Sequence, residues 1–589
     1  MSEKDMQGEP RGGLSRRSFF KGSALLSATV LGGSALAACA PSAGGSDSTA
    51  GATEGSDLGE AAPIAPVDPP AEWSAEADIV VVGTGGGGLA ATLLARDRGA
   101  TVITIEKDQT PGGATKCAGG FASLPGGSTI QDEMGYAWPV YPYSRKELVN
   151  RLREQYQSSN DDRLVGTIAD YSGIFLDWAV LEHEAPMVAV AGGSAFFPKT
   201  LAEGKVTSYM AVKEVTDYFY QQGVEAGADF RMGTRCENLV VDGGRVVGIK
   251  AKDGKTDEEL YFKARKGVVL CAGGMGMNWD MLKEYIPTAY RHAVYGGPTP
   301  SHTGECIRMA VGAGADIAGW DSWNCWESAP DNGTREWQPF WGARTIFQVP
   351  WLNIDKRGER YNFYAMPQQP EVTFEVGRGD VAVAATQMSR IGGRGYAIFD
   401  ADYEQYMFKM NVAPGAERRP WTKDDPIVED AMFDKDFSVE FQKGVDAGLI
   451  KKADTLEELA EQLGLKPEVV TAAVDNWNEL CEKGEDTELD VPYLPEWLTP
   501  VKTPPFYGGV IGGCIGKTHA GLRTDESLRV LNPEGEVIAG LFANFHTAGG
   551  LCGESSFGGS PHMPSGSFLG GNLLSWVSGY LAADTALAS

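Results

Sequence analysis

One stretch of the sequence decides the fold: Asp78-Ile79-Val80-Val81-Val82-Gly83-Thr84-Gly85-Gly86-Gly87-Gly88. A short apolar strand enters a glycine-rich turn with GxGxxG spacing, and a helix-like stretch over residues 89–98 follows. A second strand over residues 101–105 ends at Glu106. This is the strand–turn–helix–strand order, with an acid about twenty residues on, that the dinucleotide fingerprint requires. We therefore predict that the backbone of Gly83, Gly85, Gly87 and Gly88 approaches a pyrophosphate, and that Glu106 accepts a hydrogen bond from a ribose hydroxyl.

Further glycine-rich turns lie far along the chain. The first of them, Pro111-Gly112-Gly113-Ala114-Thr115-Lys116-Cys117-Ala118-Gly119-Gly120, follows Glu106 closely, and a simple NAD domain does not need it. Others occupy residues 267–276, 540–544 and 569–572. Glycine loops at both ends of the chain imply one cofactor held by distant segments, which favours FAD over NAD.

The composition is that of a globular protein with an acidic surface. The 589 residues are too many for one compact core. The net charge of −28 disfavours nucleic acid and anionic lipid as partners. The nine cysteines contain no CxxC pair and the histidines no HExxH motif, so c-type haem and common zinc sites are not indicated. An iron–sulfur cluster assembled from distant cysteines stays open.

The first 39 residues have the pattern of an export signal. Ser15-Arg16-Arg17-Ser18-Phe19-Phe20-Lys21 is a twin-arginine pattern, followed by an apolar stretch over residues 22–38. Leu36-Ala37-Ala38-Cys39 resembles a lipoprotein cleavage site, which favours lipid anchoring at Cys39 in the cell envelope; a conventional cleavage site nearby is the alternative. Residues 40–74 are predicted to be a flexible linker. An exported enzyme lacks a supply of nicotinamide cofactor, which again favours FAD.

In these motifs the chain resembles the FAD-dependent fumarate reductase / succinate dehydrogenase flavoprotein superfamily, which also contains the 3-ketosteroid dehydrogenases. The exported fumarate-reductase-like flavoproteins of anaerobic bacteria are the most similar branch. The resemblance implies an α/β fold, in which a Rossmann-like FAD-binding domain (residues 75–310 and 500–589) carries an inserted α+β capping domain (residues 311–499). The apolar spacing over residues 455–478 separately predicts two cap helices.

The same resemblance implies which residues contact FAD. No histidine lies between Lys107 and Phe121, where membrane-bound relatives attach their flavin, so FAD is expected to be non-covalent. His546 stands where relatives commonly carry Glu, and Leu573 and Leu574 are expected to cover the isoalloxazine. The other expected FAD contacts are Gly87, Glu106, Ala114, Thr115, Gly119, Gly120, Ala272 and Glu305.

The implied reaction is hydride transfer from reduced FAD to an activated C=C bond, with an acid protonating the neighbouring carbon. The fumarate reductases use an arginine followed by an acid as the proton donor, and the best match here is Arg378 before Asp380. Gly379 separates the two, so a surface Arg–Asp pair is the alternative. Arg378 is the predicted catalytic residue.

Several residues that would bind a dicarboxylate differ in this chain. Phe568 stands where relatives carry a carboxylate-clamping arginine, which removes a charge and adds an apolar wall. Gly516-Lys517 stands where relatives carry a His pair. Lys517, His519 and Phe568 are the predicted substrate-binding residues; for Lys517 and His519 a purely structural role is the alternative. Six of the fourteen tryptophans lie in residues 320–351 and suit either a large planar ligand or a Trp-rich core. These differences favour an alkene bulkier than fumarate, such as a steroid, phenylpropenoid or lactone.

The sequence thus predicts an exported FAD-dependent ene-reductase of anaerobic respiration, which takes electrons from a membrane-associated cytochrome or quinol module. Two alternatives stay open. Gly521-Leu522-Arg523-Thr524-Asp525 resembles a segment of the 3-ketosteroid dehydrogenases, which desaturate a ring instead. A tethered flavin redox carrier is the non-enzymatic alternative.

Overall fold

The computed structural model describes the chain from residue 61 onward, with gaps. These residues belong to one compact unit, Ser56–Ser589. The predicted signal, with Cys39, and most of the predicted linker lie outside the described residues. The described ranges are 61–122, 127–135, 162–190, 195–206, 210–296, 299–331, 333–337, 345–347, 349–361, 391–409, 424–428, 433–489, 492–551 and 570–589.

An eight-stranded sheet forms the dinucleotide domain. Its order is β18-β19-β9-β1-β2-β6, with β8 paired to β9 and β7 to β8. The central strand β1 runs parallel to β2 and β9, and Val80 lies opposite Ile103 and Val268. Val80 is fully buried, because both faces of a central parallel strand are covered. The strands are β1 (Ala75–Val82), β2 (Val102–Glu106), β6 (Asp229–Met232), β7 (Thr234–Asp242), β8 (Arg245–Asp253), β9 (Glu259–Leu270), β18 (Arg529–Leu531) and β19 (Val537–Ala543).

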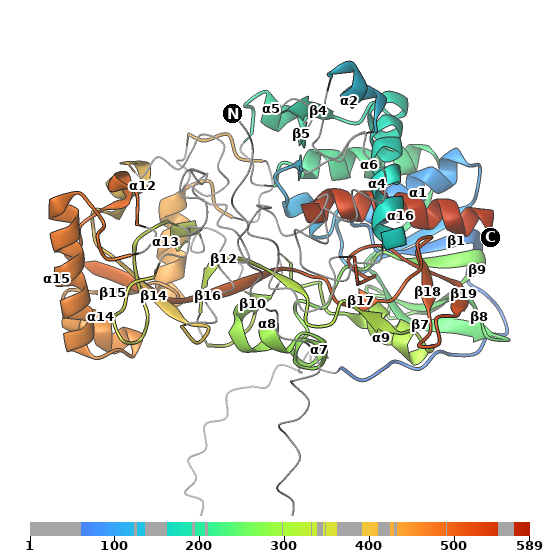
Figure 1. The fold of residues 1–589 in the computed structure, drawn as a ribbon. Coiled ribbons are helices and arrows are strands. Elements are labelled where there is room, and N and C mark those ends of the chain that lie inside the picture. The colour runs from blue at the N-terminus through green and yellow to red at the C-terminus, as the bar shows by residue number, and fades with distance from the viewer. Residues whose placement is uncertain are drawn as a thin grey trace, which may run out of the picture. The chain divides into compact units, whose positions relative to one another are not determined.

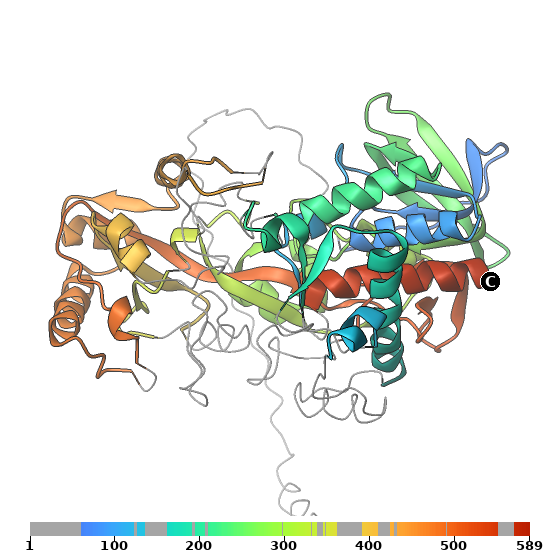
Figure 2. The same cartoon turned by 90° about the horizontal axis from the view of Figure 1, so that it is seen from above.

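Two helices from opposite ends of the chain pack together over this sheet. Helix α1 (Gly86–Asp97) and helix α16 (Gly570–Ala588) lie side by side in both views (Figures 1 and 2). A Cβ at Gly87 would lie 2.6 Å from the carbonyl oxygen of Ser575, and one at Gly579 would lie 2.1 Å from that of Gly87. The two helices can therefore approach this closely only because glycine occupies both positions where they cross. Although α16 is apolar, no helix of the described residues combines the length and apolarity needed to cross a membrane.

A second, six-stranded sheet carries the cap. Its order is β10-β16-β14-β13, with β12 and β15 also paired to β16. The long strand β16 begins in the cap core, where Ile511 is buried, and ends in the core of the dinucleotide domain, where Ile515 is buried. The strands are β10 (Ala293–Gly296), β12 (Trp323–Pro330), β13 (Leu352–Ile354), β14 (Gly395–Phe399), β15 (Lys451–Ala453) and β16 (Phe506–Thr518).

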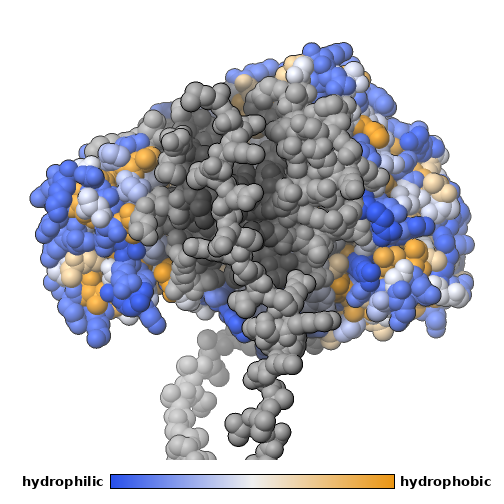
Figure 3. Space-filling model, in the orientation of Figure 1, coloured by the Kyte–Doolittle hydropathy of each residue, from blue (hydrophilic) through white to orange (hydrophobic). Residues whose placement is uncertain are grey.

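Among the described residues, four helices lie beside the cap sheet (Figure 1): α12 (Tyr403–Lys409), α13 (Phe437–Asp446), α14 (Leu456–Leu463) and α15 (Pro467–Lys483). The last two confirm the helix pair predicted over residues 455–478. Thr455 caps α14 by accepting a hydrogen bond from the Glu458 N–H, as expected of a helix start. On the face shown in Figure 3, hydrophilic residues dominate the described surface of this cap and of the dinucleotide domain.

The tryptophans of residues 320–351 support the core interpretation where their side chains are described. Trp323 is 1% exposed and donates to Thr288 Oγ1 at 2.9 Å. Trp351 is equally buried and stacks on Phe399 with ring centroids 5.0 Å apart. Trp320, in contrast, is 43% exposed. The side chain of Trp326 and all of Trp341 lie outside the described residues.

The remaining elements are short strands and helices. Short strands form a three-stranded sheet in the order β3-β5-β4 and a two-stranded β11-β17 pair. These strands are β3 (Phe121–Ala122), β4 (Met187–Val190), β5 (Ala195–Pro198), β11 (Ile317–Ala318) and β17 (Gly521–Leu522). The helices are η2 (Thr115–Cys117), α2 (Thr129–Glu133), α4 (Asp162–Asp177), η3 (Trp178–Glu182), α5 (Lys199–Ala202), α6 (Lys213–Glu225), α7 (Trp279–Tyr285), α8 (Pro287–His292), α9 (Glu305–Gly312) and η5 (Pro495–Trp497).

Candidate active site

The first glycine turn leaves the start of α1 open to a ligand. Gly83 has φ +104°, and a Cβ there would lie 2.3 Å from the Cys271 carbonyl oxygen, so only glycine fits. A Cβ at Gly88 would in turn lie 1.9 Å from the Gly83 carbonyl oxygen. Gly85 is the N-cap residue and offers no side-chain cap. The N–H of Gly86 donates to Thr115 Oγ1. The following N–H groups of this turn meet no side-chain cap from Gly85, and the helix dipole favours an anion there.

Glu106 is fixed at the end of β2, beside this turn. Its Oε2 accepts hydrogen bonds from the Thr84 N–H at 2.8 Å and from Thr84 Oγ1 at 2.7 Å. Its Oε1 accepts from the Asp108 N–H at 2.9 Å. The side chain is almost fully buried, so the carboxylate is held in one orientation. It retains acceptor capacity for a ribose hydroxyl.

The second glycine-rich loop lies against the first. The Gly112 N–H donates to the Thr84 carbonyl at 3.0 Å, and the Gly86 N–H donates to Thr115 Oγ1 at 3.0 Å. Farther along, Asn572 Nδ2 at the start of α16 donates to the Gly120 carbonyl at 3.1 Å. Ala114 caps η2, and Gly119 is buried. The second loop thus contacts both the first turn and the start of α16.

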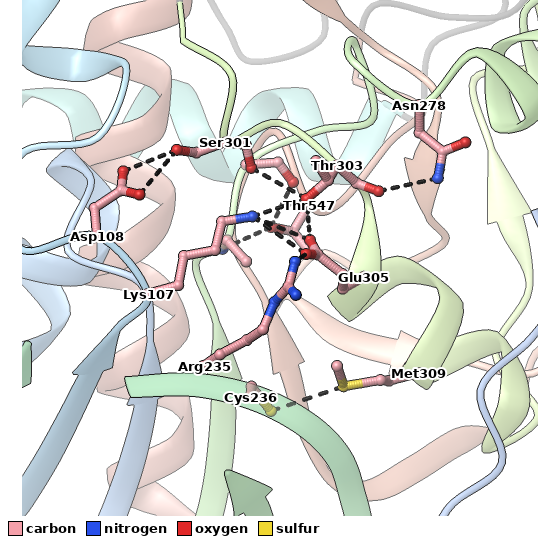
Figure 4. Close-up of polar contacts among 12 residues, drawn as sticks. Lys107, Asp108, Arg235, Cys236, Asn278, Ser301, Thr303, Glu305, Met309 and Thr547 are labelled. Atoms are coloured by element: carbon pink, nitrogen blue, oxygen red, sulfur yellow. Dashed lines mark hydrogen bonds and ion pairs between the residues drawn. The ribbon is translucent and has the colours of Figure 1, made fainter. Parts of the chain in front are cut away.

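Glu305 takes part in a charge network rather than standing alone (Figure 4). Lys107 Nζ lies 3.2 Å from its Oε2, and Arg235 also pairs with it, as does the Thr303 hydroxyl. Burial opposes ionisation, but the two cations and the hydroxyl outweigh it and lower the pKa of Glu305 to about 2. Ser301 donates to Asp108 Oδ2 at 2.8 Å in the same place. This network fastens the loop after β2 to the start of α9.

A third glycine turn follows β9 and contacts two threonines from the C-terminal part of the chain. The Ala272 N–H donates to Thr547 Oγ1, which in turn donates to the Gly273 carbonyl, both at 3.1 Å. A Cβ at Gly274 would lie 2.2 Å from Thr518 Oγ1. Sequence reasoning missed Thr518 and Thr547, because a hydroxyl beside a glycine turn has no signature until the fold brings the two together.

Three buried histidines with lowered pKa values, His302, His519 and His546, lie near this turn. A Cβ at Gly273 would lie 3.0 Å from the ring of His302, and burial lowers the pKa of His302 to about 4. Burial, followed by the charge of Lys517, lowers the pKa of His546 to about 3 and that of His519 well below its ordinary value. The His519 and His546 rings lie 6.4 Å apart, centroid to centroid.

The predicted substrate residues lie near the start of α16 where they are described. A Cβ at Gly571 would lie 2.8 Å from Lys517 Nζ, so that ammonium lies over the first turn of the helix. His519 is 1% exposed, with its Nδ1 3.3 Å from Ser322 Oγ, and direct contact with a substrate would require it to move. Leu573 and Leu574 are buried in the core. Phe568, Arg378 and Asp380 lie outside the described residues.

The residues present fit an FAD molecule. Several buried side-chain atoms along the site have no hydrogen-bond partner within the described part of the chain: Asn544 Oδ1, His546 Nδ1, His519 Nε2 and Asn572 Oδ1. Buried polar atoms normally have partners, so such a series is expected of a site shaped for a long polar ligand. The glycine turns provide the close backbone approach that a pyrophosphate needs. Nowhere in the described ranges do three or more His, Cys, Asp or Glu side chains form a candidate metal site.

Comparisons with known proteins agree with this geometry. Residues 78–560 match the family described as the FAD binding domain. The chain is 25% identical to a digoxin reductase of Eggerthella lenta, covering 93% of both chains. It is also 25% identical to a cytochrome-type fumarate reductase of Shewanella frigidimarina, covering 82% of this chain and 74% of that one. The 3-ketosteroid Δ1-dehydrogenase of Sterolibacterium denitrificans shares the fold, with a TM-score of 0.61, 19% identity and coverage of 87% and 99%.

Proposed function

Because the chain belongs to the FAD-binding domain family and is an FAD-dependent oxidoreductase acting on C=C or CH–CH bonds, we propose that it reduces an activated alkene bulkier than fumarate. The observation that carries the proposal is the meeting of three distant segments along one polar site. Thr115 contacts Gly86 at one end, and Asn572 contacts Gly120 at the other. Such a site suits an extended dinucleotide, with its ring end toward the cap strand β16.

The chain's own residues hold and orient the reactants. When bound and reduced, FAD supplies a hydride to the β-carbon of the alkene. The N–H groups at the start of α1 bind the diphosphate, and Glu106 binds a ribose hydroxyl. Arg378 is proposed to protonate the α-carbon, a role that requires a neighbouring acid such as Asp380 to restore its proton.

The larger substrate is supported by sequence and by similarity. Phe568 replaces a carboxylate-clamping arginine, which favours an apolar group over a second carboxylate. The relative matched over 93% of both chains is a digoxin reductase, and digoxin is far larger than fumarate. An enone or enoate of steroid, lactone or phenylpropenoid type is therefore the proposed substrate class.

We also propose export by the twin-arginine route, lipid anchoring at Cys39 and a membrane-associated cytochrome or quinol module as the electron donor. The signal pattern of residues 15–39 supports the first two. A Cys39→Ser variant tests the anchor. It should leave the membrane fraction while keeping its FAD, whereas unchanged membrane retention would contradict lipidation.

The alternative direction is desaturation of a ketosteroid, the reaction of a dehydrogenase that shares this fold. The segment Thr524-Asp525, which resembles part of the ketosteroid dehydrogenases, gives this alternative no further support. Asp525 Oδ1 accepts from the N–H groups of Ser527 and Arg529, each at 3.0 Å, so this residue holds the turn before β18. Its position is explained by the fold without a catalytic role.

Reoxidation of reduced enzyme separates the two directions. The chain lacking residues 1–39 is loaded with FAD, reduced chemically without oxygen, and mixed in turn with fumarate, a hydroxycinnamate and a Δ4-3-ketosteroid. Rapid recovery of the oxidised flavin spectrum with a bulky alkene but not with fumarate supports the proposal. Recovery with fumarate alone contradicts the substrate class. Bleaching of oxidised enzyme by a saturated ketosteroid, with no response to alkenes, establishes the dehydrogenase instead.

A further inference from the structure

A lysine lies at a helix end that ordinarily disfavours one. Gly571 is the second residue of α16, and a Cβ there would lie 2.8 Å from both Cδ and Nζ of Lys517. The N-terminus of a helix carries a partial positive charge, so the ammonium adds charge of the same sign. Such a concentration of positive charge is suited to a negatively charged ligand.

Buried polar atoms beside the ammonium independently indicate a ligand. His519 lies just past the end of β16, two residues after Lys517. Burial, followed by the charge of Lys517, lowers the pKa of its imidazole. His519 is 1% exposed, yet its Nε2 has no partner in the part of the chain that the structure describes. The buried Asn572 Oδ1 and His546 Nδ1 have none there either. Because both imidazoles are held neutral by burial, the positive charge of this cluster comes from Lys517 and the helix.

This cluster lies at the start of α16, the helix that also contacts the predicted pyrophosphate turn. Helix α16 contacts the pyrophosphate turn at Ser575, whose carbonyl lies 2.6 Å from a Cβ at Gly87. From Ser575 to Gly571 the helix rises roughly 6 Å. At that point Asn572 binds Gly120, which belongs to the second glycine loop. A flavin held by its diphosphate at α1 would extend its ring system along this helix toward Lys517.

The redox chemistry of the ring supplies the matching charge. Reduction by two electrons with uptake of one proton at N5 leaves one negative charge, spread over N1 and the C2 carbonyl. A fixed cation beside that edge binds the reduced form more tightly than the oxidised form. We propose that Lys517 is this cation, so that it sets the reduction potential of FAD instead of binding the substrate. This inference rests on the proposed function, since it requires FAD in the site.

A redox titration tests it without any alkene. Lys517→Met, Lys517→Arg and the control Lys502→Met are loaded with FAD and titrated against a dye of known potential. Lys502 is an exposed lysine near the start of β16, paired with Glu482 at 2.7 Å. For Lys517→Met we expect the affinity for reduced FAD, relative to oxidised FAD, to fall at least tenfold, which lowers the potential by about 30 mV. Lys517→Arg should retain most of the wild-type value, and Lys502→Met all of it.

An unchanged reduction potential in Lys517→Met would overturn the assignment. Equal weakening of the affinities for oxidised and reduced FAD gives this same unchanged potential, and would show that Lys517 binds FAD without tuning it. An unchanged potential with a raised KM for the alkene would make Lys517 a substrate ligand. Because no alkene enters the titration, a failure of the proposed reduction reaction leaves this result interpretable. Thermal melting of each variant verifies that the fold is intact.

Discussion

The hydroxyl of Thr115 accepts a hydrogen bond from the backbone N–H of Gly86, with 3.0 Å between the oxygen and the nitrogen. This contact joins the second glycine loop to the first turn of α1, across 29 residues of sequence. Part of the FAD site is therefore held in shape before the cofactor binds. Preorganisation of this kind lowers the cost of binding.

Thr115→Val should weaken FAD binding because it removes that hydrogen bond while keeping the side-chain volume. The expected loss is about 1 kcal/mol, or roughly fivefold in Kd. Quenching of FAD fluorescence by the apoprotein measures it. Thr110→Val is the matched control, since Thr110 contacts Lys116 Nζ at 3.0 Å on the exposed side of the same loop. A tighter Kd in Thr115→Val would mean that Thr115 competes with the cofactor for the Gly86 N–H.

Gly87→Ala should lower the stability of the fold, whereas Gly85→Ala should weaken FAD binding. A Cβ at Gly87 would lie 1.9 Å from Asn544 Nδ2 and 2.6 Å from the Ser575 carbonyl, which forces α1 and α16 apart. We expect a loss of about 1–3 kcal/mol in unfolding free energy. A Cβ at Gly85 would lie 3.7 Å from Thr115 Oγ1, an ordinary van der Waals distance, so the apoprotein should keep its stability while FAD binds less tightly. Denaturant unfolding and FAD titration of both variants check this, and equal stability of the two apoproteins would refute it.

Glu305→Gln should change the acid stability of the chain. The folded-state pKa of about 2 lies below the ordinary value of 4.5, so ionised Glu305 stabilises the fold fully above pH 4.5, and this stability is lost as the pH falls toward 2. At neutral pH the variant should lose about 3 kcal/mol of unfolding free energy. The difference in unfolding free energy between the variant and the wild type should decrease as the pH falls from 4.5 to 2.

Melting temperatures measured across that pH range test the Glu305 prediction. Glu479→Gln is the control, because its ion pair with Lys483 is exposed, with 3.6 Å between the charged atoms. Such surface pairs contribute little. A gap between Glu305→Gln and the wild type that stays constant with pH would show that packing, and not charge, is the cause.

Arg360→Ala should destabilise the cap. Arg360 makes two hydrogen bonds of 2.8 Å to Asp486, and its guanidinium carbon lies 4.5 Å from the Trp477 ring centroid. Both side chains of the ion pair are at most 2% exposed, so the alanine leaves a buried carboxylate without its partner, at a cost of about 3–5 kcal/mol. Arg357→Ala, at a site that is 61% exposed, should cost far less. Chemical denaturation measures the unfolding free energy of both variants. Similar losses in the two would contradict the stabilising role of the buried Arg360–Asp486 pair.

Arg378→Gln should abolish alkene reduction while FAD binding and reduction potential stay unchanged. Loss of a general acid typically lowers kcat by about 10²–10⁴-fold. Arg357→Gln is the control, because Arg357 is an exposed arginine earlier in the sequence of the predicted capping domain. Stopped-flow reoxidation by the best alkene measures the rate. A kcat within twofold of the wild type would support the surface-pair interpretation of Arg378.

The sequence by itself determined the parts of this protein that depend on near neighbours. The apolar run before Gly83, the GxGxxG spacing and Glu106 predicted β1, α1 and β2, because strand and helix periodicity and glycine turns are local properties. The cap helices after Thr455 were predictable for the same reason. The family resemblance extended this to FAD.

Tertiary structure alone decided which distant residues meet. Lys517 lies over Gly571, Asn572 binds Gly120, and Glu305 is held by Lys107 and Arg235. The burial of His519 behind the site was equally hidden, although its sequence position suggested a substrate contact. These contacts form only when segments that are far apart in the sequence pack around a common core. Local patterns of neighbouring residues do not specify which distant segments come into contact.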